Sequence, residues 1–209
     1  MKKEIYQSIC EKLQNAKLII VSKYQSETKM MEYYQEGQRD FAENRVQELL
    51  KKREHLPQDI RWHMIGHLQS NKVKYIAPFV TMIHSVHSLS LLDEIEKQAA
   101  KVQRVLSVCL QFNLAKEVTK SGFAYEEWRQ VMAYAQNCTH LQVKGIMVMG
   151  PHTEDVSKID HVFAQAEQLL KDMQQTYPHV CELSMGMSSD YSLALQHGAT
   201  MIRVGSILF

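Results

Sequence analysis

The sequence predicts an α/β protein that folds as a single (β/α)8 barrel of the TIM type. Eight short apolar or alternating runs recur along the 209 residues, and segments with helical periodicity separate them. Strands that alternate with helices pair in parallel through helical crossovers. Eight such units are the number that closes a barrel. A doubly wound open sheet is the alternative, because a sequence pattern counts strands imprecisely.

The first half of the chain supplies four of the predicted strands. Residues 1–16 read as a short N-terminal amphipathic helix, and the helix ETKMMEYYQEG ends at Gly37, a residue common just after helix C-termini. The basic run KKRE (51–54) at the end of another helix is interpreted as a solvated helix end. The four strand runs are LIIVSK (18–23), DFAEN (40–44), RWHMIGH (61–67) and MIHSV (82–86).

The second half repeats the pattern with longer helices. LLDEIEKQAAKVQ, AYEEWRQVMAYAQN and IDHVFAQAEQLLKDMQQTY carry apolar residues at helical spacing, and SSDYSLALQHG runs from cap-type residues to Gly198. Neither a linker nor an internal repeat interrupts the pattern, so residues 1–209 are predicted to form one domain. The four strand runs are LSVCLQFN (106–113), QVKGIMVM (142–149), ELSMG (182–186) and TMIRVG (200–205).

The composition argues against several classes of partner. The formal net charge is +1, from 24 basic and 23 acidic residues, which is not the clustered basic excess of a nucleic-acid-binding protein. The four cysteines have neither metal-site nor disulfide spacing and fit reduced thiols in the cytoplasm. The sequence has no signal peptide and no apolar run of membrane-spanning length. His63 and His67, if both lie in one strand, are about 13 Å apart, too far to share a metal ion.

Polar residues gather where the predicted strands end, which is the active-site face of a barrel. Lys23 ends the first strand, although lysine is rarely buried without a partner. SMGMSSD (184–190) brings glycine with Ser188 and Ser189, and RVGS (203–206) follows the eighth strand. Turn and capping chemistry explains either loop alone. The two loops together, opposite a lysine, indicate that the ligand is a phosphorylated carbonyl compound. The loops suit its phosphate, and a desolvated lysine with a lowered pKa attacks carbonyls to form a Schiff base.

Longer motifs across nearly the whole chain resemble a known family. They are IIVSK (19–23), FAENRVQE (41–48), WHMIGHLQSNK (62–72), IHSV (83–86), KSG (120–122), GIM (145–147), LSMGMSSD (183–190) and ATMIRVGSILF (199–209). In this order they resemble the pyridoxal-phosphate homeostasis protein family. That family is similar to the barrel domain of alanine racemase, which belongs to the fold-type III class of pyridoxal-phosphate (PLP) proteins.

The resemblance implies a PLP-binding protein that takes part in intracellular vitamin B6 homeostasis. Lys23 would hold PLP as a Schiff base, Ser188 would bind its phosphate, and Arg203 would face the pyridine nitrogen. The other residues that the resemblance places in the pocket are Asn44, His67, Met187 and, through their backbone amides, Gly205 and Ser206. Ala42 stands where the family usually has glycine, and its methyl group is expected to crowd the pocket slightly.

The same resemblance favours a carrier over an enzyme. A guanidinium group keeps its proton, so a pyridine nitrogen facing Arg203 stays largely unprotonated and the ring is a weaker electron sink. Racemases of this type add a tyrosine from a separate β-domain, whereas this sequence ends at Phe209, directly after the eighth strand. We therefore expect a monomeric carrier that passes PLP to PLP-dependent apoenzymes. The alternatives are a weak PLP-dependent amino-acid racemase, a class I aldolase that uses Lys23 directly, and a plain interaction protein.

Overall fold

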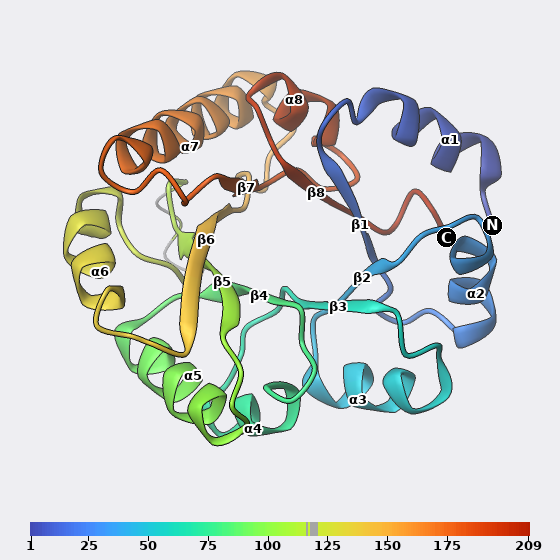
Figure 1. Ribbon diagram of the computed structural model, residues 1–209. Helices are drawn as coiled ribbons and strands as arrows, with labels where there is room; N and C mark the ends of the chain where they lie inside the picture. The colour runs from blue at the N-terminus through green and yellow to red at the C-terminus, as the bar shows by residue number, and fades with distance from the viewer. Residues whose placement is uncertain (116, 118–120) are drawn as a thin grey trace.

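The computed structural model describes residues 1–115, 117 and 121–209. The strands close a barrel in chain order from β1 to β8, and each strand is parallel to its neighbours (Figure 1). This arrangement confirms the predicted (β/α)8 barrel. The strands are β1 (Lys17–Val21), β2 (Asp40–Glu43), β3 (Arg61–Met64), β4 (Met82–Val86), β5 (Leu106–Phe112), β6 (Leu141–Val148), β7 (Glu182–Ser184) and β8 (Met201–Val204).

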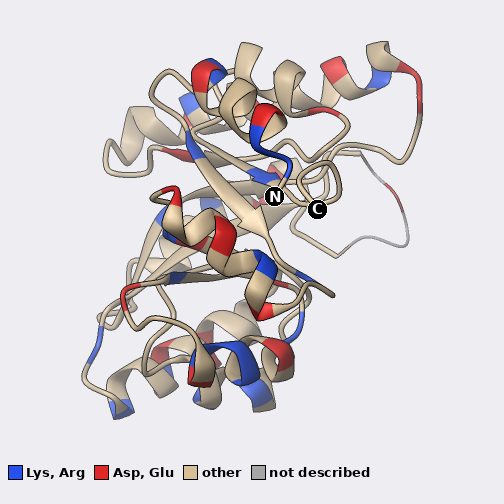
Figure 2. Cartoon of the chain, turned by 90° about the vertical axis from the view of Figure 1, so that its right-hand side faces the viewer, with Lys and Arg blue, Asp and Glu red and all other residues tan. Residues whose placement is uncertain are grey.

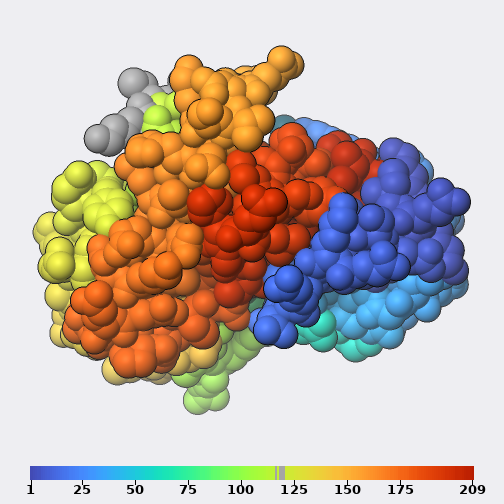
Figure 3. All heavy atoms as spheres, turned by 90° about the horizontal axis from the view of Figure 1, so that it is seen from above, coloured from blue at the N-terminus to red at the C-terminus, as the bar shows by residue number. Residues whose placement is uncertain are grey.

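Helices surround the barrel, and the N-terminal helix lies beside the C-terminal segment (Figures 1 and 3). The predicted N-terminal helix over 1–16 is shorter in the structure, because Gln14 has a positive φ of 50° that turns the chain towards β1. The helices are α1 (Lys3–Lys12), α2 (Glu27–Gln35), α3 (Val46–His55), α4 (Val73–Ile76), α5 (Leu89–Lys101), α6 (Trp128–Ala135), α7 (Val156–Thr176) and α8 (Tyr191–Gln196), with 3₁₀ turns η1 (Ser70–Lys72) and η2 (Tyr125–Glu127).

Two apolar cores hold the barrel together, one between strands and helices and one inside the strands. Successive strand residues point to opposite faces, so the outer core takes residues such as Ile20 and Phe41 and the inner core takes their neighbours. The inner core consists of Ile19, Val21, Ala42, Met82, Cys109, Met147 and Met201. Ala42 is fully buried there, so its methyl group packs inside the barrel.

Charged residues of both signs are present in nearly equal number. Lys and Arg residues are interspersed with Asp and Glu residues along the ribbon in Figure 2. No helix among residues 1–115, 117 and 121–209 is both long and apolar enough to cross a membrane.

Three strands, β1, β3 and β7, end two or three residues earlier than the sequence pattern suggested. β1 ends at Val21, so Lys23 lies in the following loop, and β3 ends at Met64, so His67 also lies in a loop. The prediction that His63 and His67 share a strand was therefore wrong, and with it the distance argument against a shared metal. In the described part of the chain, no group of His, Cys, Asp or Glu side chains is arranged to hold a metal ion.

The prediction of a solvated KKRE run was wrong at Lys52. Lys52 is only 4% exposed, and its Nζ lies 2.6 Å from Glu43 Oε1. Val46, Leu49 and Lys52 recur at intervals of three, which places all three on the buried face of α3. Lys51, next to Lys52, is exposed as expected.

Asp40, the first residue of β2, is expected to make stability depend on acid. Burial alone would raise the pKa of its carboxyl, but hydrogen bonds from Arg61 and His63 outweigh burial and hold the pKa well below its ordinary value. Because the pKa in the folded state is the lower one, this stabilisation is complete above the unfolded pKa of about 3.9 and is lost as pH falls below it.

We expect Asp40→Asn to lower the free energy of unfolding by about 1–3 kcal/mol at pH 7 and by less near pH 2.5. Urea unfolding at both pH values measures the difference. An equal loss at the two pH values would contradict the assigned pKa shift.

Candidate functional site

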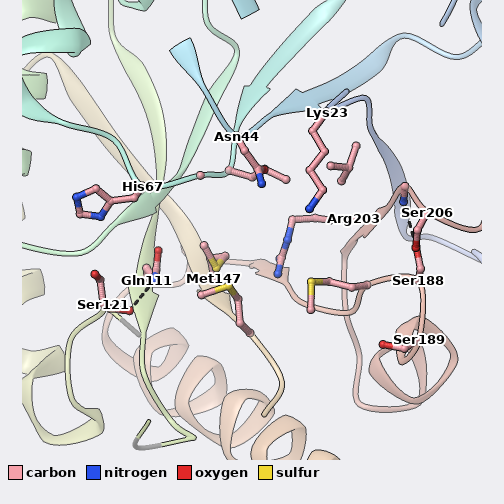
Figure 4. Close-up of a pocket in the computed structure, with 16 residues that line it drawn as sticks. Lys23, Asn44, His67, Gln111, Ser121, Met147, Ser188, Ser189, Arg203 and Ser206 are labelled. Atoms are coloured by element: carbon pink, nitrogen blue, oxygen red, sulfur yellow. Dashed lines mark hydrogen bonds between the residues drawn. The ribbon is translucent and has the colours of Figure 1, made fainter. Parts of the chain in front are cut away.

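A cavity of about 510 Å³ opens at the C-terminal ends of the strands (Figure 4). Side chains from the ends of β1, β2, β3, β7 and β8 converge on it, as expected for the active-site face of such a barrel. All eight site residues predicted from the sequence line this one cavity. They are Lys23, Asn44, His67, Met187, Ser188, Arg203, Gly205 and Ser206.

Lys23 lies on a tight turn that follows β1. The Ser22 carbonyl accepts a hydrogen bond from the Gln25 backbone N–H at 3.0 Å, and Tyr24 has a positive φ of 64°. The Lys23 side chain extends into the cavity towards Arg203 (Figure 4). The expectation of a desolvated lysine was wrong, because Lys23 is exposed. In the described part of the chain, Lys23 forms no ion pair.

A buried ion pair fixes the turn that carries Lys23. Lys52 Nζ donates to the Ser22 carbonyl at 2.6 Å and to Glu43 Oε1 at 2.6 Å. The Ser22 hydroxyl donates to the same Glu43 oxygen at 2.7 Å. These three groups are buried, so the backbone directly before Lys23 is tied to both β2 and α3.

The loops after β7 and β8 form a polar end of the cavity, where Ser188 and Ser206 lie together (Figure 4). Ser188 Oγ accepts from the Gly205 N–H at 3.2 Å. Among the residues that the structure describes, no acceptor takes the backbone N–H of Ser188, Ser189 or Ser206. The helix predicted to follow this loop starts only at Tyr191 and has six residues, so these donors belong to the turns and not to a long helix N-terminus.

Arg203 lies at the floor of the cavity and is 4% exposed. Its Nη1 donates to Ser184 Oγ at 2.7 Å, and its Nη2 donates to the Val148 carbonyl at 3.1 Å. Burial lowers the pKa of Arg203 to about 10, which still leaves the guanidinium charged at neutral pH. The cavity therefore has a fixed positive charge opposite its open side.

Gly66 allows the loops after β2 and β3 to touch. A Cβ at this position would lie 2.2 Å from the Asn44 carbonyl oxygen and 2.6 Å from Asn44 Cα. Because both are backbone atoms, they cannot rotate away, and only glycine fits beside Asn44 without a backbone shift.

Gly66→Ala is expected to lower the free energy of unfolding by about 3 kcal/mol, at the upper end for overpacking. Gly37→Ala is the matched comparison, since its Cβ meets no atom within 4 Å and only its φ of 97° is unfavourable. That strain costs about 1 kcal/mol. Denaturant unfolding of both variants measures the difference, and equal costs would contradict the close contact at Gly66.

Sequence reasoning missed part of the lining, and the alternation of the strands could have found some of it. Gln111 lies two residues after the inward-facing Cys109 and donates from Nε2 to the Ser121 carbonyl at 2.5 Å. Ala42, expected to crowd this pocket, does not line it. Lys120 of the KSG motif falls outside the described residues. Ser189, expected with Ser188 in the phosphate loop, also lines the cavity. The lining residues not predicted for the site are Val21, Ile65, Gly66, Gln111, Ser121, Met147 and Met149.

Residues 3–209 match the family model described as alanine racemase, N-terminal domain. The chain is 39% identical over 199 residues to the pyridoxal phosphate homeostasis protein of Aquifex aeolicus (strain VF5), a match that covers 93% of this chain and 86% of that protein. It is 36% identical over 203 residues to the protein of the same name in Schizosaccharomyces pombe, with 93% and 84% covered. This chain belongs to the pyridoxal phosphate homeostasis protein family.

Solved structures share the barrel fold of this chain. PipY of Synechococcus elongatus PCC7942 is 37% identical and covers 99% of this chain, with TM-scores of 0.94 for PipY without PLP and 0.90 for PipY with PLP bound. This chain covers 98% of PipY in both structures. An alanine racemase of Clostridium difficile 630 is 14% identical, with a TM-score of 0.80 over 99% of this chain and 55% of its own. That likeness shows a shared fold alone.

Proposed function

We propose that this protein binds PLP as a Schiff base on Lys23 and serves as a PLP carrier in vitamin B6 homeostasis, without efficient catalysis. The observation that carries the proposal is the convergence of Lys23, free backbone donors and Arg203 on one cavity. Membership of the pyridoxal phosphate homeostasis family and the PLP bound to the relative PipY support it.

The residues of the cavity fit the three chemical groups of PLP. The backbone N–H groups of Ser188, Ser189 and Ser206, which no acceptor among the described residues takes, suit a phosphate together with the Ser188 hydroxyl. Gly205 lets the loop after β8 pack directly against the end of β1, since a Cβ there would lie 2.8 Å from the Val21 carbonyl oxygen. When bound, PLP supplies an aldehyde that an amine can capture and a pyridine ring that can accept electrons.

Arg203 favours a protein that holds PLP over an enzyme that uses PLP in catalysis. Its guanidinium group donates hydrogen bonds and accepts none, so it keeps a facing pyridine nitrogen unprotonated. Among the described lining residues, the basic side chains are those of Lys23, His67 and Arg203. His67 stacks on His87 with ring centroids 4.4 Å apart, at the end of the cavity away from Ser188 (Figure 4). A tyrosine acid of the racemase kind is absent from the described lining.

The phosphate assignment predicts a selective effect of Ser188. We expect Ser188→Ala to raise the Kd for PLP about tenfold, because one hydrogen bond to a charged group is lost. Ser189→Ala keeps its backbone N–H and is expected to change the Kd less than about twofold. Fluorescence or absorption titration measures both, and equal effects of the two variants would contradict the role of the Ser188 hydroxyl.

The experiment that tests the proposal is a PLP titration followed by turnover assays with a panel of amino acids. A visible absorption band that saturates at one equivalent, without amino-acid racemisation above that of free PLP, supports the carrier. A saturable band with rapid racemisation would instead establish the racemase. Absence of any band would favour an aldolase or an interaction protein.

The proposal also includes the oligomeric state, the location and the partners of the carrier. The carrier acts as one domain over residues 1–209, as a monomer, and in the cytoplasm, where its four free cysteines stay reduced. It passes PLP to PLP-dependent apoenzymes and engages neither nucleic acid nor membrane. Transfer to an apoenzyme that outpaces transfer from free PLP at equal concentration is the measurement that checks delivery.

A further inference from the structure

We propose that His63, His84 and Ser184 form a one-directional hydrogen-bond relay that joins Asp40 to Arg203 and positions Arg203 at the floor of the cavity. This inference deepens the proposed function and rests on it for the meaning of Arg203 as a cofactor contact. The relay itself is a property of the protein without any ligand. The three relay residues are positioning residues, because they act through Arg203.

Four successive hydrogen bonds make up the relay. Asp40 Oδ1 lies 3.0 Å from His63 Nε2, and His63 Nδ1 lies 2.9 Å from His84 Nε2. His84 Nδ1 lies 2.8 Å from Ser184 Oγ, which in turn accepts from Arg203 Nη1 at 2.7 Å. Each ring nitrogen of both histidines thus has one partner within normal hydrogen-bond distance.

The relay runs through the inside of the barrel and is closed to water. His84 and Ser184 are fully buried, and His63 and Arg203 are each 4% exposed. β4 and β7 are not neighbours in the sheet, so the bond between His84 and Ser184 crosses the barrel interior. The path begins at the first residue of β2 and ends in β8 at the cavity.

The direction of the relay can be derived from the Asp40 end. The ionised Asp40 carboxylate only accepts, so His63 Nε2 carries the hydrogen of the first bond. A His63 ring that carries this single hydrogen accepts at Nδ1 from His84 Nε2. Burial, with the nearby His63 and Arg203 as further causes, holds the pKa of His84 well below its ordinary value, so His84 is neutral. Its Nδ1 therefore accepts from the Ser184 hydroxyl.

The Arg203 end gives the same direction independently. Arg203 has no acceptor atoms, so Ser184 Oγ must accept from it. The Ser184 hydroxyl hydrogen then needs another acceptor, and His84 Nδ1 is the one within reach among the described residues. Both ends require the Nε2–H tautomer of His84, so every hydrogen in the relay points towards Asp40.

The relay fixes the orientation of Arg203 at the floor of the cavity. Ser184 presents a lone pair to Arg203 because its own hydrogen is taken by His84. The negative charge of Asp40, itself paired with Arg61, anchors the far end of the chain of dipoles. A buried network of this kind specifies one arrangement, since any unpaired member would be costly. Arg203 is thereby held as a donor in one place, with Val148 fixing its other nitrogen.

The first test reads the histidine tautomers in the protein without PLP. Long-range ¹H–¹⁵N correlation spectra at neutral pH should show His63 and His84 as neutral rings protonated on Nε2. Spectra of His63→Gln and His84→Gln proteins assign the two rings among the ten histidines. An Nδ1–H tautomer or an imidazolium at His84 would overturn the relay, whether or not the protein binds PLP.

The second test measures coupling between the two ends through the Kd for PLP. Ser184→Ala should raise the Kd about tenfold, and Asp40→Asn about threefold. The double variant should match Ser184→Ala alone at about tenfold, because a relay already cut cannot transmit a second change. A rise of about thirtyfold, the product of two independent effects, would overturn the relay.

Glu182→Gln is the matched control for the loss of a carboxylate. Glu182 is the first residue of β7, as Asp40 is of β2, and its side chain is 17% exposed against 14% for Asp40. It binds Lys17 and Thr200 outside the relay, so its substitution should change the Kd less than about twofold. An effect equal to that of Asp40→Asn would overturn the relay.

The two tests separate the relay from the proposed function. Wild-type protein that gives no PLP band contradicts the proposed function, while the tautomers still decide the relay. Wild-type protein that binds PLP but shows the other His84 tautomer contradicts the relay alone. If a substituted protein does not fold, the wild-type spectra still give the answer.

Discussion

Lys23→Ala is expected to abolish the visible absorption band that wild-type protein gives with PLP and to raise the Kd at least about a hundredfold. The alanine side chain removes the amine that captures the aldehyde, so only the phosphate and ring contacts remain. Absorption titration of the two proteins side by side measures the effect. Because Lys23 is exposed and forms no ion pair in the described part of the chain, the substitution should leave the unfolding temperature nearly unchanged.

Lys72→Ala is the control for a non-specific reaction of PLP with surface amines. Lys72 ends the η1 turn after β3 and does not line the cavity. Its substitution should leave the band and the Kd at wild-type values. A band that survives Lys23→Ala and disappears in Lys72→Ala would move the covalent site away from β1.

Lys52→Met is expected to have the largest effect on stability. It removes the cation that pairs with Glu43, whose side chain is 1% exposed, and leaves an uncompensated buried charge. Breaking such a pair costs about 3–5 kcal/mol. Urea unfolding measures the loss, and Lys51→Met, one residue earlier on the exposed face of α3, should cost less than about 0.5 kcal/mol.

A double variant distinguishes the lost pair from a general packing defect. Glu43→Leu with Lys52→Met removes both charges, and most of the stability lost in Lys52→Met should return. The turn before Lys23 would still lack its hydrogen bond from Lys52 to the Ser22 carbonyl. PLP binding should therefore be weaker in the double variant than in wild-type protein, although the fold recovers. Full recovery of binding would contradict a positioning role for the ion pair.

The barrel could be predicted from the sequence because alternation and helical spacing are local patterns. The gathering of Lys23, Ser188 and Arg203 at one cavity could be predicted as well, since the ends of parallel strands meet at one face of the barrel. The predicted ends of the strands were less accurate than the predicted strands themselves. After Met64 the chain passes so close to Asn44 that only glycine fits at position 66, and no local pattern signals such a contact.

The buried polar contacts were the part that local patterns could not predict. Alternation indicates that His84 and Ser184 face inward, but it does not indicate that they meet across the barrel, 100 residues apart in sequence. Lys52 is different, because its spacing from Val46 and Leu49 already placed it on the buried face of α3. Its charge suggested solvent, and its partner Glu43 explains the burial.

The most direct test of the central claim is to locate the covalent bond to PLP. Wild-type protein is incubated with PLP, reduced with borohydride and digested, and the modified peptide is identified by mass spectrometry. We expect one reduced PLP adduct per chain, on Lys23. An adduct spread over several lysines, or confined to a lysine other than Lys23, would contradict it.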